Sequence, residues 1–66
     1  MNRQQRLTMA DAAATRAASL ARDVQRAAEA GDSQGRVPRL AAAGSLWADV
    51  ARAHAAIAAA LPETEV

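Results

Sequence analysis

The sequence predicts an all-α fold, a two-helix antiparallel hairpin that dimerises into a four-helix bundle. Alanine, the strongest helix former, supplies 21 of the 66 residues. A segment with two glycines and the polar residues Asp32, Ser33 and Gln34, 31–37, divides the chain into two halves of helical length. A β fold has few of its preferred residues here, because the chain contains no Phe or Tyr and one Trp. The whole chain, 1–66, is therefore expected to be a single helical-hairpin domain.

The first helix is expected over about residues 3–30. Two pairs can cap its start, Asn2 with Gln5 or Thr8 with Asp11, since each offers a capping oxygen and a residue at the third helical position. The apolar residues fall on one face at helical spacing, opposite a charged face. That apolar face comprises Met9, Ala13, Ala17, Leu20, Val24 and Ala28.

The connecting loop is expected over residues 31–37. Gly31 suits the position just past the first helix, because glycine enters the left-handed region cheaply. Pro38 suits the first turn of the next helix, where a missing N–H costs nothing. A loop of this length fits two antiparallel helices, and it is longer than the turn of a DNA-reading helix-turn-helix.

The second helix is expected over about residues 38–61, followed by a tail, 62–66, that begins with a proline. It carries two apolar stripes. The large-residue stripe repeats at steps of three and four, as in a coiled coil, and consists of Leu40, Ala43, Trp47, Val50, His54, Ile57 and Leu61. The small-residue stripe lies beside it and consists of Ala41, Gly44, Ala48, Ala51, Ala55 and Ala58.

The second helix is also nearly free of charge, since only Asp49 and Arg52 are charged between residues 40 and 61. We interpret it as the inner helix of a larger bundle, with one stripe on the first helix and the other on a second chain. Close approach of another backbone would justify Gly44 in mid-helix. The predicted interface residues are Leu20, Val24, Leu40, Gly44, Leu46, Trp47, Val50, His54, Ile57 and Leu61.

His54 is the one polar residue of the large-residue stripe, and we expect it to face Ala13, Ala14 and Ala17. Two hypotheses follow. A buried His that is costly to charge could act as a pH switch of the interface. The favoured alternative is a structural, neutral His that hydrogen-bonds to a carbonyl, to water or to a second copy. Trp47, the single aromatic residue, is expected to anchor the core, with a binding anchor as the alternative.

The predicted function is a non-enzymatic protein–protein interaction module, a small self-associating adaptor, regulator or assembly subunit. The chain has no Cys, Lys or Tyr and a single His, so we expect no catalysis, no metal and no cofactor. Chains this short usually need a partner to bury enough apolar surface, which points to a homodimer. An alternative is a small subunit that docks its second helix on a different protein. No signal peptide or membrane-spanning run is evident, so we expect a cytoplasmic protein without a membrane partner.

Arginines of the first helix leave nucleic-acid binding open as another alternative. Arg16, Arg22 and Arg26 are the candidate contacts, although acidic residues are interleaved with them and no second aromatic is available for base stacking. In size and outline the expected hairpin is similar to the Rop-type RNA-binding hairpins, which pair into four-helix bundles. This similarity of architecture implies a dimer and a regulator that binds nucleic acid. No RNA-contacting motif of that family can be placed on these residues.

Overall fold

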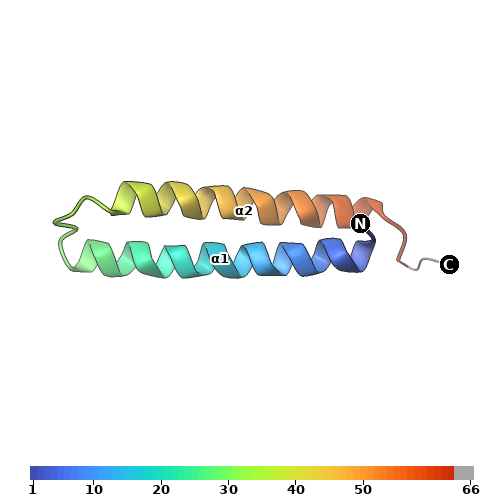
Figure 1. The fold of residues 1–66 in the computed structure, drawn as a ribbon, viewed down its shortest axis with the longest axis horizontal. Helices are drawn as coiled ribbons and strands as arrows, with labels where there is room; N and C mark the ends of the chain where they lie inside the picture. Colours follow the sequence, from blue (N-terminus) through green and yellow to red (C-terminus); the bar gives the residue numbers. More distant parts are fainter. Residues whose placement is uncertain (64–66) are drawn as a thin grey trace.

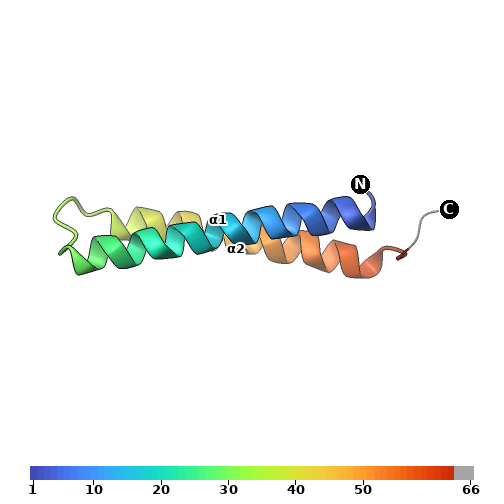
Figure 2. The ribbon, with the colours of Figure 1, turned by 90° about the horizontal axis from the view of Figure 1, so that it is seen from below.

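The computed structural model describes residues 1–63 as two antiparallel helices, α1 (Arg3–Glu29) and α2 (Val37–Ala60). The helices lie side by side along their whole length, with the connection at one end and the start of α1 and the end of α2 at the other (Figure 1). Seen from below, they cross at a shallow angle near their middles (Figure 2). The molecule is a rod of 55 × 13 × 13 Å. The prediction of an all-helical fold with two packed helices is confirmed. Residues 64–66 of the predicted tail lie outside the described residues.

A reciprocal cap at Asn2 begins α1. The Gln5 backbone N–H donates to the Asn2 side-chain oxygen, and the Asn2 backbone N–H donates to the Gln5 side-chain oxygen, both at 2.8 Å. The two bonds satisfy donors that the first helical turn would otherwise leave unpaired. Of the two predicted starts, the structure therefore uses Asn2, and Thr8 lies inside the helix.

Gly31 and Asp32 determine the backbone conformation of the loop between α1 and α2. Gly31 adopts φ +87°, as predicted for the residue after a helix. Its N–H donates to the Ala28 carbonyl, and the Asp32 N–H donates to the Ala27 carbonyl, which is the Schellman pattern of helix termination. Asp32 also has a positive φ, +47°. Its carboxylate accepts hydrogen bonds from the N–H groups where α2 begins, a role that the sequence analysis did not assign.

Two prolines frame α2. Pro38 is the second residue of the helix, where no intrahelical donor is required. At the other end Leu61 is extended, with ψ 153°, because the ring of Pro62 disfavours a helical residue before it. The helix therefore ends at Ala60.

The packing between the helices uses small residues. Within residues 1–63 only Ala13 and Ala58 are buried apolar residues, at 2% and 1% exposure. A Cβ atom placed on Gly44 would lie 3.5 Å from the Leu20 Cβ, so the two backbones approach closely at this point. Short side chains allow this approach, and α2 therefore turns part of its small-residue stripe toward α1 together with part of the large-residue stripe. From that stripe Ala58 is buried and Gly44, Ala48 and Ala51 are half-buried.

The large-residue stripe is consequently divided between the interior and the surface. Leu40, Ala43, His54 and Leu61 are half-buried, whereas Trp47, Val50 and Ile57 are exposed. The spacing in the sequence predicts that these seven residues form a single apolar stripe on one side of the helix. The contact line of α2 is instead rotated toward the alanines. On α1, the predicted apolar face shows the same division, since Ala13, Ala17, Leu20 and Val24 face inward and Met9 and Ala28 are exposed.

Candidate interaction surface

An exposed apolar patch lies along the middle of α2 and consists of Leu46, Trp47, Val50 and Ile57. Their exposed fractions are 66%, 37%, 40% and 40%. At 100° per residue, Leu46, Val50 and Ile57 fall within an arc of about 40°, and Trp47 lies about 60° from Val50 on the side nearer α1. Single exposed apolar side chains are ordinary, but four large ones within about 100° of one helix make this side of α2 unusually apolar.

Trp47 joins the patch to α1. The guanidinium carbon of Arg16 lies 5.0 Å from the centroid of the Trp47 ring, within the range of a cation–π contact. Trp47 is thus a partly covered residue at the edge of the contact between the two helices, and its place in the core of a dimer stays a prediction.

Met9 extends the patch onto α1. It is 42% exposed, and its position seven residues before Arg16 places both on nearly the same side of the helix, about 20° apart. Because Arg16 reaches Trp47, this side of α1 adjoins the patch. The patch therefore has an apolar neighbour on the second helix.

His54 meets an arginine near the start of α1. The Arg6 Nη1 atom lies 3.2 Å from the His54 Nδ1 atom, and both side chains are partly buried. Arg6 was not among the predicted site residues, and the expected alanine neighbours of His54 stay a prediction. The register explains the difference: Gly44 lies against Leu20, so ten residues farther along α2 His54 comes level with about residue 10 of α1, within reach of Arg6. The sequence alone does not fix this register.

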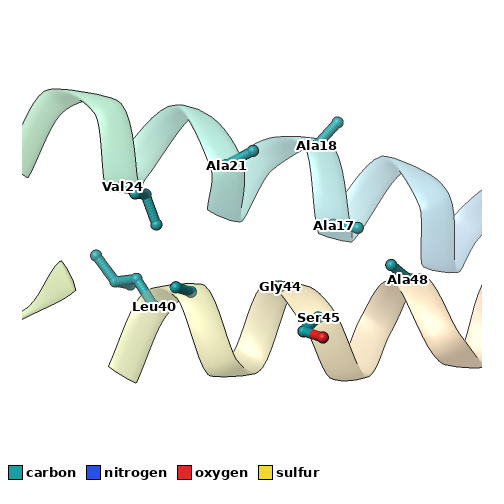
Figure 3. A pocket seen from close by; sticks show the side chains of 9 residues that line it. Ala17, Ala18, Ala21, Val24, Leu40, Gly44, Ser45 and Ala48 are labelled. Carbon is teal, nitrogen blue, oxygen red and sulfur yellow. The ribbon is translucent and has the colours of Figure 1, made fainter. Parts of the chain in front are cut away.

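A shallow apolar groove occupies the opposite flank of the hairpin (Figure 3). It has a volume of about 520 Å³, and Val24 and Leu40 point toward one another at one end of it. Ala41, one of its lining residues, precedes Val50 by nine positions and so lies about 180° around α2 from it. The groove and the patch are thus separate surfaces. Its lining residues are Ala17, Ala18, Ala21, Val24, Leu40, Ala41, Gly44, Ser45 and Ala48.

The structure does not gather the three predicted nucleic-acid contacts. Arg16 lies over Trp47, and Arg26 forms an ion pair with Asp23 of the preceding turn. Arg22 is exposed and lies about 120° around α1 from Arg16. Two of the three guanidinium groups therefore have partners within the hairpin.

The predicted interface residues fall into two groups. Leu46, Trp47, Val50 and Ile57 form the patch, while the other members lie at least partly between the helices: Leu20, Val24, Leu40, Gly44, His54 and Leu61. Within residues 1–63, neither helix combines the length and the apolarity that crossing a membrane requires. No family model matches the chain, and neither a curated protein nor a solved structure matches it.

Proposed function

We propose that this chain is a protein–protein interaction module whose exposed patch packs against the same patch of a second copy, forming a four-helix bundle. The observation that carries the proposal is the patch itself. Small residues of α2 pack against α1, and Leu46, Val50 and Ile57 are exposed. In a bundle of four helices these side chains would become the central core.

The exposed area supports a contact of this kind. A compact monomer of 6.8 kDa is expected to expose about 4,000 Å². The hairpin exposes 4743 Å². The excess, about 700 Å², is close to the roughly 800 Å² that each partner contributes to a stable interface. A second copy packed on the patch would bury part of this excess.

A second copy is the partner that the chemistry of the patch favours. The two charged residues within this part of α2, Asp49 and Arg52, form an ion pair with each other. Arg52 lies about 160° around the helix from Val50, outside a contact between two patches, and Asp49 lies at the edge of the patch, about 60° from Leu46. A copy of the same chain presents a matching apolar surface, and a two-fold axis would bring the two together. A dimer also adds large side chains to an interior that now contains only two buried alanines among residues 1–63.

Three single substitutions on α2 test which surface associates. Val50→Lys places a charge in the centre of the patch, Ala41→Lys places one in the groove, and Ala56→Lys places one on an exposed position about 120° from Val50. We expect Val50→Lys to convert the dimer into a monomer, because burying an unpaired ammonium group is costly. The other two variants should remain dimeric. Sedimentation equilibrium gives the mass of each.

Two outcomes would contradict the proposal. A dimer that survives Val50→Lys but is lost with Ala41→Lys would assign the association to the groove. A wild-type chain that is monomeric, and gains helicity only when a different protein is added, would assign the patch to a foreign partner.

A further inference from the structure

We propose that two copies of the hairpin pair with their loops at opposite ends, so that Arg39 of each copy lies beside the end of α2 in the other. The inference rests on the proposed dimer and adds its orientation and one specific charge contact. Two observations carry it: the apolar side chains are unevenly distributed over the two helices, and an exposed arginine lies in line with the patch.

The face of the hairpin that carries the patch is more apolar on α2 than on α1. Arg16 marks this face on α1, because its guanidinium group lies over Trp47. Gln5 and Asp23 leave α1 within about 20° of Arg16, and Met9 adds one apolar side chain. The α1 part of the face is therefore mainly polar. The large side chains of the patch are better buried by α2 of a second copy than by its α1.

Two symmetric arrangements place α2 against α2 of a second copy. In a parallel pair both loops lie at the same end, and each residue along the contact meets its own equivalent. In an antiparallel pair a two-fold axis crosses the helices near Val50, in the middle of the patch. Residues before Val50 then meet residues at the same distance after it, and the loops lie at opposite ends.

Arg39 favours the antiparallel arrangement. It is exposed and lies 11 residues before Val50 and 18 before Ile57, so the three side chains leave α2 within about 20° of one another. It takes part in neither of the ion pairs recorded within residues 1–63. A parallel pair would bring the two Arg39 side chains together, and like charges that face each other across an interface weaken it.

An antiparallel pair gives Arg39 a negative neighbour. Leu61, which directly follows α2, is as far beyond Val50 as Arg39 is before it. The last turn of α2 contains no basic residue, and its final carbonyl groups carry a partial negative charge. Glu63, two residues later, is exposed. The guanidinium group of each copy would thus meet the negative end of α2 in the other.

Arg3 lies at the same end of the hairpin but faces the opposite flank. It lies 18 residues before Ala21, so both side chains leave the same side of α1. Ala21 lines the groove, which is separate from the patch. Arg3 therefore leaves open the position that Arg39 of the second copy would take.

The orientation is tested with a spin label on Gln34→Cys, an exposed loop position outside the patch in a chain that contains no other Cys. Gln34 lies 16 residues before Val50, so double electron–electron resonance should give roughly 50 Å between the two labels of a dimer. A distance below about 30 Å, the width of a few adjacent helices, would place both loops at one end. That result would overturn the inference and leave the dimer standing. A labelled chain with a monomeric mass and no dipolar coupling would contradict the dimer itself.

The charge contact is tested by sedimentation equilibrium. Arg39→Glu should raise the dissociation constant of the dimer about tenfold, since each dimer contains two such contacts. Adding Glu63→Arg to this variant reverses both charges and should recover about threefold or more of the lost affinity.

Arg22→Glu is the matched control, because it changes the net charge by the same amount. Arg22 is exposed and lies about 160° around α1 from Leu20, the residue that approaches Gly44 of α2. Its dissociation constant should stay within about twofold of the wild-type value. Equal dissociation constants for Arg39→Glu and Arg22→Glu would overturn the charge contact.

Discussion

At the scale of single residues, the surroundings of Gly44 show how closely α1 and α2 approach each other. A Cβ at this position would lie 3.5 Å from the Leu20 Cβ and 4.0 Å from the Ala17 carbonyl oxygen, which are ordinary contact distances. The approach therefore requires a small residue but leaves room for one methyl group. Gly35, in the loop, differs because its φ is +63° and an added Cβ would be strained there.

The same substitution should therefore have opposite effects at these two glycines. Gly44→Ala should raise the free energy of unfolding by about 0.5–1 kcal/mol, because alanine is the better helix former. Gly35→Ala should lower it by about 1 kcal/mol, because alanine is strained in the left-handed region. Urea denaturation followed by circular dichroism measures both. A destabilised Gly44→Ala variant would show that the helices approach more closely than this structure has them.

Residues with local roles were the most predictable from the sequence. The Asn2 cap, the left-handed Gly31 and the position of Pro38 each depend on a few neighbouring residues, and their chemistry permits few alternatives. The contact between Arg6 and His54 was not predictable, because it depends on the register of two helices across 48 positions. A shift of one helical turn would have given His54 a different neighbour.

At the scale of the elements, α2 depends on Asp32 for its start. No side chain caps α2 at Arg36, the residue that precedes it. The Asp32 carboxylate instead accepts from the N–H groups of Arg36 and Val37, at 2.7 and 3.1 Å. One loop residue thus satisfies two backbone donors at the entrance to the helix.

Removing that carboxylate should destabilise the hairpin. Asp32→Ala loses both hydrogen bonds and also places alanine at a positive φ, so we expect a loss of about 1–2 kcal/mol. Asp32→Asn keeps a side-chain oxygen and tolerates the left-handed backbone, so it should cost less than half as much. The free energies of unfolding from urea titrations decide this. Equal losses in the two variants would exclude a capping role.

The two stripes of α2 were visible in the sequence, but their assignment was not. Spacing alone cannot tell which of two adjacent apolar faces meets α1. The contact line runs between the two stripes: Gly44 and Ala58 let the backbones approach closely, and Leu40 and His54 of the large-residue stripe are half-buried as well. The larger face, with Val50 and Ile57, is left outside.

At the scale of the whole molecule, the hairpin is long and thin, and its interior is small. A rod 55 Å long and 13 Å across cannot enclose many side chains, and Ala13 and Ala58 are its buried apolar residues within the described part. Each buried CH₂ contributes about 0.8 kcal/mol, so two methyl side chains add little. Leu46, Val50 and Ile57 of the patch are exposed in the hairpin, so burying them against a second copy would add stability.

The proposed dimer is tested most directly by the mass of the native species across a dilution series, measured together with helicity and Trp47 fluorescence. We predict a species of twice 6.8 kDa at high concentration. On dilution the mass and the helicity should fall together, and the emission of Trp47 should shift to longer wavelength as the patch becomes exposed. A monomer of 6.8 kDa that stays fully helical from millimolar to low micromolar concentration would contradict the proposed dimer.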